Sequence, residues 1–426
     1  MTHGIRRALT LIAGAAAFAL FTPLTAQASP GDLDGTFGGG DGMATFSLAP
    51  VSEEAGTVLA TTGGRVLILG EDVAAQDVAV ARLAPNGDPD TTFGGGDGLV
   101  TMHFLDNLDD WNAMVVLPGG KIEVAVDTSG VGIDKLGLGR FTPAGVADGT
   151  FGGGDGKLII GFGSDFAAYD MVALDNGKLL ISGEIFLGGG NSRFMVVRVK
   201  ANGSLDNSFG GGDGFVQTEF RTGGDGAWRI AVDTHGRIVV AGWAQEGSGS
   251  YDTAVARYEP DGTPDHSFSG DGKLITQVFE NDDDYAIGLG LQGDKILVGE
   301  YLSLNGAEHL GVIRYLPNGQ LDPTFGGGDG EVITPNPGDD QQAVDLAIDA
   351  NNRILVGGRL ESATEQFLVA RYGPNGKLDP VFGTSGFAAS TFGSFAGAEG
   401  MSVAGNGKIL VAGDVGSDTG VARFLP

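Results

Sequence analysis

The chain repeats one short glycine-rich motif seven times at nearly constant intervals. Five copies read FGGGDG, and two are shortened to FSGDG and FGTSG. Successive copies begin 56, 58, 58, 59, 57 and 57 residues apart. We call the residues that begin the copies the anchor phenylalanines: Phe37, Phe93, Phe151, Phe209, Phe268, Phe325 and Phe382. A regular period close to this length is typical of proteins in which each repeat forms one packed structural unit.

Each repeat has the pattern of four short β-strands. In the sixth repeat, β-branched and apolar runs at 331–334, 343–349, 353–358 and 366–372 are separated by Gly, Asn, Asp and Pro. Such runs predict strands, and no repeat shows helical periodicity. Four antiparallel strands per repeat make one propeller blade. We therefore predict an all-β fold, a seven-bladed β-propeller, in which the motif connector crosses from the outer edge of one blade to the centre of the next.

The chain ends at the same point of the repeat at which the segment from Ser29 begins. The sequence ends in VARFLP at Pro426, and the segment from Ser29 reads SPGDLDGTFGGGDG. Elsewhere a VARxxP-like strand runs directly into the same motif. This match predicts that the N-terminal segment joins the last blade and closes the ring. The alternative is an open β-array, which would need atypical repeats to cap its ends.

The first residues have the features of an export signal. Arg6 and Arg7 precede an apolar stretch at 8–24, and Ala26-Gln27-Ala28 resembles a cleavage site. We predict a signal peptide at 1–28 and a single propeller domain at 29–426. The mature protein would then be exported to the periplasm or outside the cell. No later stretch is long and apolar enough to predict insertion into a membrane.

Composition excludes several classes of function. The chain has 25 Lys and Arg against 54 Asp and Glu, a formal net charge of −29. An acidic protein lacks the basic surface that nucleic-acid binding requires, so we expect no nucleic-acid partner. Cysteine is absent, which excludes disulfides and thiolate chemistry. We expect a monomer.

The anchor motif resembles that of a known family. An LDxxFG segment at a spacing of about 57 residues is similar to the delta-60 repeat of bacterial exported proteins, and the resemblance covers roughly residues 31–426. The resemblance implies a β-propeller and no particular activity. The seventh repeat departs from the motif because Ser385 stands where the other repeats have Asp. A role that needs this Asp in all seven repeats is therefore disfavoured.

Charged residues recur at fixed positions around each anchor. We predict that the anchor phenylalanines pack between blades and that a strand arginine pairs with the LDxxF aspartate of its repeat. An architectural role is favoured over a ring of ligand-binding groups. The aspartates are Asp34, Asp90, Asp148, Asp206, Asp265, Asp322 and Asp379. The arginines are Arg82, Arg140, Arg198, Arg257, Arg314, Arg371 and Arg423.

The glycine loops raise the question of calcium. Each of six loops contains one aspartate: Asp41, Asp97, Asp155, Asp213, Asp271 and Asp329. Calcium takes six to eight oxygen ligands, and one carboxylate is not a site. The spacing matches neither an EF-hand nor the tandem nonapeptide calcium motif. We favour turn stabilisation and keep calcium as the alternative.

Loops that differ between repeats are candidates for binding. Alternating strand directions place the first-to-second and third-to-fourth loops on one face, opposite the motif connectors. We call this the acidic rim, and binding sites often occupy such variable loops on a rigid scaffold. Its predicted residues are Asp106, Asp109, Asp110, Asp282, Asp283, Asp284, Asp339, Asp340, Trp243 and Tyr251. Clustered carboxylates suit cations or a basic partner, and a merely solvated surface is the alternative.

No catalytic signature is evident. The four histidines after residue 28 are spread over different repeats without ligand-like spacing, and we interpret them as incidental loop residues: His103, His235, His266 and His309. The sequence therefore favours a non-catalytic exported propeller that binds a protein or glycan at the cell envelope. The alternative is a hydrolase or lyase that acts on an extracellular polymer, and two carboxylates in one pocket would favour it.

Overall fold

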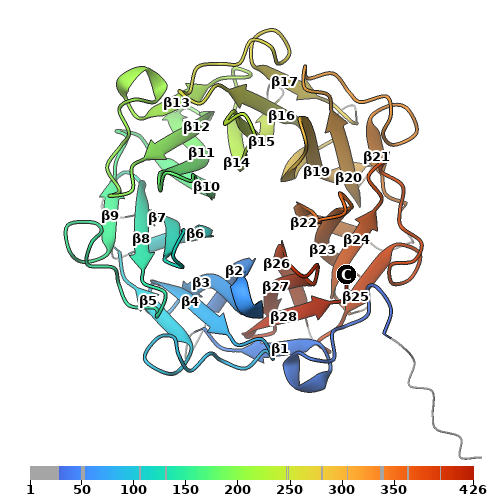
Figure 1. Cartoon of the computed structure of the whole chain (residues 1–426). Coiled ribbons are helices and arrows are strands. Elements are labelled where there is room, and N and C mark those ends of the chain that lie inside the picture. The colour runs from blue at the N-terminus through green and yellow to red at the C-terminus, as the bar shows by residue number, and fades with distance from the viewer. Residues whose placement is uncertain are drawn as a thin grey trace, which may run out of the picture.

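The computed structural model is a closed ring of seven four-stranded antiparallel sheets (Figure 1). It describes residues 28–48, 53–104, 107–129, 132–245, 247, 249–279, 282–304, 306–335, 340–361, 364–393 and 395–426. The predicted signal peptide lies outside this range except for Ala28. Helical structure in the described ranges is limited to three short 3-10 turns: η1 (Gly38–Gly40), η2 (Thr62–Gly64) and η3 (Gly210–Gly212). None of the described helices is long and apolar enough to cross a membrane.

We number the sheets as blades 1 to 7 along the chain. Blade 1 contains β2 (Glu53–Ala60), β3 (Val66–Asp72), β4 (Asp77–Leu83) and β5 (Leu99–Met102); blade 2 contains β6 (Asn107–Val116), β7 (Ile122–Ser129), β8 (Lys135–Phe141) and β9 (Lys157–Ile160). Blade 3 contains β10 (Phe166–Ala173), β11 (Leu179–Gly188), β12 (Asn191–Val199) and β13 (Phe215–Thr218); blade 4 contains β14 (Asp225–Val232), β15 (Ile238–Gln245), β16 (Tyr251–Tyr258) and β17 (Lys273–Thr276). Blade 5 contains β18 (Asp284–Gln292), β19 (Lys295–Leu304), β20 (Ala307–Tyr315) and β21 (Glu331–Ile333); blade 6 contains β22 (Asp340–Ile348), β23 (Ile354–Glu361), β24 (Gln366–Tyr372) and β25 (Phe387–Ser390). Blade 7 contains β26 (Ala396–Val403), β27 (Ile409–Val415), β28 (Asp418–Phe424) and, from the other end of the chain, β1 (Met43–Phe46).

The N-terminal segment closes the ring, as the matching phase of the two ends predicts. Strand β1 pairs antiparallel with β28, with Met43 opposite Ala422. Upstream of β1, the Gly31 amide donates to the Leu425 carbonyl at 3.0 Å. Figure 1 shows this N-terminal segment, in blue, along the outer edge of the last blade, in red. The seven-bladed prediction and the predicted closure are both confirmed.

The boundary between blades differs from the boundary between repeats. The predicted first strand of the sixth repeat, at 331–334, is β21, which is the outermost strand of blade 5. The motif connector therefore joins the third and fourth strands of one blade, and the prediction that it crosses between blades is wrong. The loop that follows the outermost strand makes the crossing instead. The reason is the closure: β1 follows the first motif and completes a blade whose other strands lie at the C-terminus.

The anchor phenylalanines pack between neighbouring blades, as predicted. All seven are at most 1% exposed. Phe37, for example, lies in a cluster with Val58 of blade 1 and Leu410 of blade 7. The guanidinium carbon of the strand arginine lies 4.1–4.8 Å from the ring centroid in every repeat. The anchor thus contributes both apolar burial and a cation–π contact to each blade.

The predicted arginine–aspartate pair forms in six repeats. Arg257 donates through Nε to Asp265 Oδ2 at 2.7 Å, and both side chains are almost fully buried. The exception is Arg140, which pairs with Glu123 of the neighbouring strand, while Lys121 contacts Asp148. Burial opposes ionisation of Asp34, but hydrogen bonds from Lys408 and Thr36 outweigh it and lower the pKa of Asp34 to about 2. These carboxylates are structural groups that order the connector.

Candidate functional site

The aspartates of the glycine loops stabilise turns. All six are exposed. In five of them Oδ1 accepts a hydrogen bond from the amide two residues later, as in Asp41 with Met43 at 3.0 Å and Asp97 with Leu99 at 3.0 Å. This geometry is the turn role that the sequence favours. None of the six belongs to a group of three neighbouring acidic or histidine ligands within the described residues, and calcium binding stays a prediction.

The residues predicted for the acidic rim divide into surface and interior positions. Asp106 and Asp339 lie outside the described residues, and Asp109 and Asp110 are described only as backbone of β6. Asp282, Asp283 and Asp340 are half-buried. Asp284 is buried instead, and its Oδ2 accepts hydrogen bonds from the Val278 and Phe279 amides at 2.8 and 3.0 Å. Asp284 thus fixes the loop that crosses from blade 4 to blade 5.

Burial of Asp284 gives the protein a distinctive pH dependence. Burial raises the pKa of Asp284 to about 6. The folded state therefore holds a proton that the unfolded state releases near pH 4, so the free energy of unfolding should fall as pH rises from about 4 to 6. The loss from this one group is at most about 3 kcal/mol. Asp284→Asn keeps the acceptor oxygen, and urea unfolding at pH 4 and pH 7 should show a smaller loss for this variant than for the unchanged protein. An equal loss in both proteins would contradict the assignment.

Trp243 and Tyr251, predicted for the same face, belong to an aromatic cluster. Their rings contact each other at 5.0 Å between centroids. Trp228 and Tyr285 complete a closed circuit of contacts: Trp228–Tyr285 at 5.4 Å, Tyr285–Tyr251 at 5.2 Å and Trp228–Trp243 at 6.4 Å. Trp228 and Tyr285 stack nearly parallel, whereas Trp243 meets its neighbours edge to face. The four rings come from blades 4 and 5 and form one continuous aromatic surface.

Two more tyrosines extend this surface. Tyr301 of blade 5 contacts Tyr285 at 5.9 Å, and Tyr169 of blade 3 contacts Trp228 at 6.3 Å. We call Tyr169, Trp228, Trp243, Tyr251, Tyr285 and Tyr301 the aromatic cluster. All six side chains are half-buried. The chain has only three Trp and seven Tyr, so more than half of these residues lie in one place.

A cavity of about 770 Å³ lies along the innermost strands at the centre of the ring. Tyr169 and Trp228 line it and so connect it to the aromatic cluster. Its charged lining residues include Asp170, Arg229 and Asp345. Arg229 Nε lies 4.0 Å from Asp345 Oδ1. Burial raises the pKa of Asp170, and it raises the pKa of Asp345 to about 6.

β-bulges explain why these charged groups lie in the centre. The innermost strands of all seven blades carry a register shift, for example between Ala168 and Asp170. A bulge leaves backbone groups without ladder partners. Asp170 Oδ2 accepts from the Ile230 amide of the next blade at 2.9 Å, and Arg229 donates to the Val344 carbonyl of blade 6 at 2.8 Å. The charged side chains therefore satisfy backbone groups: Asp170 links the neighbouring blades 3 and 4, and Arg229 links blade 4 to blade 6.

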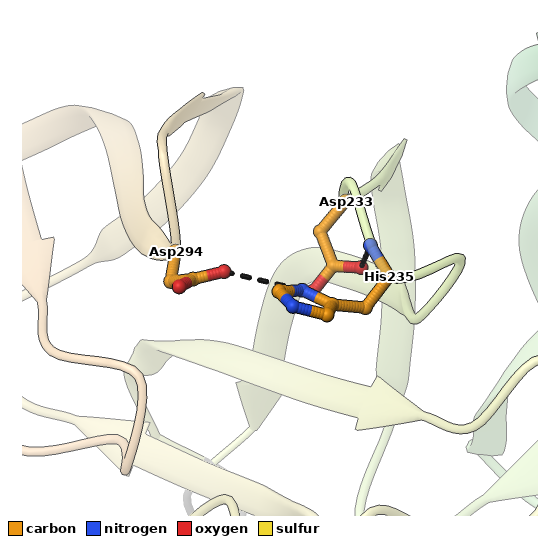
Figure 2. A group of neighbouring side chains, drawn as sticks. All are labelled: Asp233, His235 and Asp294. Carbon is orange, nitrogen blue, oxygen red and sulfur yellow. Dashed lines mark hydrogen bonds and ion pairs between the residues drawn. The ribbon is translucent and has the colours of Figure 1, made fainter.

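One group of potential metal ligands lies in the turns between the first and second strands of blades 4 and 5. Figure 2 shows Asp233 and His235, from the turn between β14 and β15, beside Asp294 from the turn between β18 and β19. His235 Nδ1 lies 3.3 Å from Asp294 Oδ1. Arg237 already pairs with Asp233 at 2.6 Å and lies 3.6 Å from Asp294. Both carboxylates thus already contact the guanidinium of Arg237, which offsets part of their charge, so this group carries no metal assignment.

A β-propeller family model matches five of the seven repeats. The family model described as "Domain of unknown function (DUF5122) beta-propeller" matches residues 64–93, 174–209, 236–268, 292–325 and 350–382. Every match ends at an anchor phenylalanine and covers the second and third strands of one blade with part of the connector that follows them. This chain is a β-propeller repeat protein. No curated protein matches its sequence significantly.

Several solved structures are similar to this β-propeller repeat protein at low sequence identity. Virginiamycin B lyase from Staphylococcus aureus is 11% identical with a TM-score of 0.50, covering 90% of this chain and 99% of that chain. YCF48 bound to D1 peptide is 12% identical with a TM-score of 0.49, covering 93% and 100%. Polysaccharide lyase Uly1 is 12% identical with a TM-score of 0.49, covering 89% and 91%. At 11% identity the likeness to virginiamycin B lyase shows the fold alone.

The sequence predicted two of the six residues of the aromatic cluster in this β-propeller repeat protein. It selected Trp243 and Tyr251 because we expected both in a long variable loop, whereas the structure places them in β15 and β16. It missed Tyr169, Trp228, Tyr285 and Tyr301, which lie within strands that read as ordinary apolar runs. An available signal was rarity: once the three recurring tyrosines that end the third strands of their blades are set aside, few Trp and Tyr remain. Those three are Tyr258, Tyr315 and Tyr372.

Proposed function

We propose that the protein is an exported, non-catalytic binding protein of the cell envelope, and that its ligand is a protein or glycan held at the aromatic cluster. The observation that carries this proposal is the concentration of six half-buried aromatic rings on strands of three adjacent blades. Partly exposed Tyr and Trp offer large apolar area with polar edges, a combination enriched in binding surfaces.

Polar groups beside the rings suit a ligand with hydroxyl or amide groups. Tyr301 donates to Glu308 at 2.6 Å, and Gln342 donates to the same carboxylate oxygen at 2.9 Å. Asp283 Oδ1 accepts from the Tyr251 amide at 3.2 Å. The basic and apolar segment at 6–24 supports export, and the LDxxFG anchors support assignment to the delta-60 repeats.

Loss of aromatic surface should abolish binding without abolishing the fold. We expect Trp243→Ala combined with Tyr251→Ala to weaken ligand binding by tenfold or more, because hot-spot aromatic residues typically contribute about 2 kcal/mol or more each. The measurement is retention of the purified protein on immobilised envelope polysaccharides and peptides, with thermal unfolding as the check on the fold. The matched control is Phe395→Ala, which removes an exposed ring from blade 7 and should not alter retention. If both variants are retained equally, the aromatic cluster is not the site.

A polymer-cleaving enzyme is the second candidate, and one observation favours it. The central cavity holds Asp170 and Asp345, two carboxyl groups whose pKa values burial raises. A cavity with perturbed carboxyl groups is a candidate site for acid–base chemistry. The same retention experiment includes an assay for released oligosaccharides. Product that forms with the unchanged protein and not with Asp345→Asn would replace the binding proposal with this enzyme.

A further inference from the structure

The aromatic cluster is surrounded by negative charge. Asp283 precedes β18 and lies beside Tyr251, and Glu308 accepts the Tyr301 hydroxyl. Burial raises the pKa of Tyr301, and the charges of Glu308, Asp283 and Glu361 raise it further. Burial and then Asp283 do the same for Tyr285. Three carboxylates thus act on Tyr301, and one of them, Asp283, also acts on Tyr285.

Positive charge near the rings is already neutralised. Arg359 pairs with Glu361 at 2.8 Å. Arg229 lies on the cavity side of Trp228, where Asp345 is 4.0 Å away and the charge of Asp170 also acts on it. Arg359 thus offsets one of the three carboxylates, Asp283, Glu308 and Glu361, that act on Tyr301. The local sign agrees with the net charge of −29 of the whole chain.

Aromatic faces and carboxylates attract the same class of ligand. The face of a tyrosine or tryptophan ring carries partial negative charge and attracts guanidinium or ammonium groups. Neighbouring carboxylates add long-range attraction that steers a cation to the rings. A neutral glycan would stack on the rings but would not be attracted by the carboxylates. The combination therefore selects for a basic ligand.

We propose that the aromatic cluster binds the arginine or lysine side chains of a basic segment of a partner protein. This inference rests on the proposed binding function and names the class of its ligand. Trp228, Tyr285 and Tyr301 provide the ring faces. Asp283 and Glu308 provide the compensating charge. Arginine is preferred over lysine because its planar guanidinium stacks on an aromatic ring and is more weakly hydrated.

A charge-matched pair of peptides tests the proposal. The probes are fluorescein-labelled hexa-arginine and hexa-citrulline, which have nearly the same shape and differ in charge. Fluorescence anisotropy with the purified protein at 50 mM salt should show binding of hexa-arginine at least tenfold tighter than binding of hexa-citrulline. Affinity should fall as salt is raised. Equal affinity for the two peptides would overturn the proposal.

Two substitutions locate the binding. Tyr285→Phe keeps the ring and should bind hexa-arginine within twofold of the unchanged protein. Tyr285→Leu removes the ring and should weaken binding roughly fivefold to thirtyfold. Tyr301→Leu should weaken it in the same direction and serves if Tyr285→Leu does not fold. Phe395→Leu, in blade 7, should have no effect. If the leucine variants bind as the unchanged protein does, the peptide binds elsewhere on the acidic surface and the proposal is wrong.

A third arm separates this inference from the proposed function. Neutral oligosaccharides are titrated against the tryptophan fluorescence of the same proteins. A sugar-dependent change that Tyr285→Leu abolishes, without binding of hexa-arginine, would overturn the basic partner and leave the binding function standing. Absence of any response to both peptide and sugars would overturn the basic partner and remove the support for a ligand at this cluster.

Discussion

A chain that lacks residues 29–48 should lose more than about 5 kcal/mol of unfolding free energy. The deletion removes the anchor Phe37, and loss of one buried phenylalanine side chain alone costs about 3–5 kcal/mol. It also removes Asp34, which accepts from Arg423 at 2.6 Å and from Lys408 at 2.6 Å. Arg423 would then be buried without its counter-ion. Thermal unfolding followed by circular dichroism measures the change.

The same deletion exposes a sheet edge. Without β1, the backbone groups of β28 that pair with residues 43–46 face solvent, and unpaired edges promote association between chains. Size-exclusion chromatography should therefore show oligomers of the deleted protein. A synthetic peptide of residues 29–48 should restore the unfolding midpoint, because it binds only the folded ring. The control is a chain that begins at Ser29, which should unfold like the full chain. An unchanged midpoint for the deleted chain would contradict the role of the N-terminal strand in closure.

Arg257→Met should destabilise the protein by about 3–5 kcal/mol, which is typical of breaking a buried ion pair. Arg257 is 1% exposed, donates to Asp265 and lies over the Phe268 ring. Its loss leaves the buried Asp265 carboxylate with only the more distant guanidinium of Arg237, whose Nη1 lies 3.9 Å from Asp265 Oδ2. The matched control is Arg65→Met. Arg65 makes an equivalent 2.8 Å contact with Asp90 but is 43% exposed, so its loss should cost less than about 1 kcal/mol.

Urea unfolding at pH 7 compares the two variants. Adding Asp265→Asn to Arg257→Met removes the buried carboxylate charge that lost its close partner, and should recover part of the lost stability. Equal effects of Arg257→Met and Arg65→Met would show that burial does not decide the value of these contacts. No recovery in the double variant would show that packing over Phe268, and not charge, dominates the role of Arg257.

Repetition made most of the fold predictable. Seven equivalent copies report the same local structure, so the four strands, the anchor position of Phe268 and the Arg257–Asp265 pair could each be inferred from the pattern. The boundary between blades could not, because a strand such as 331–333 reads the same whichever sheet it joins. The observed pairings decide it: β21 pairs with β20, and β1 pairs with β28.

The candidate site was less predictable because it breaks the repetition. Tyr285 and Trp228 do not occupy equivalent positions of their repeats, and their contact depends on how blades 4 and 5 pack. Asp284 follows Asp282 and Asp283 in an apparent run of surface carboxylates. It is buried because it is the first residue of β18, where its side chain accepts two amides of the crossing loop. Such differences depend on three-dimensional neighbours and not on local pattern.

The offset between repeats and blades has a consequence for how the ring changes in evolution. Every repeat supplies the outermost strand of one blade and the three inner strands of the next blade. Each sequence repeat therefore contributes to two neighbouring blades. Recombination that removes or adds a whole repeat leaves both ends in the phase that β1 and β28 require. The number of blades can therefore change in a single genetic step without a new way of closing the circle. The number of blades in this architecture is therefore set by the number of repeats in the sequence and by the angle at which neighbouring blades can pack.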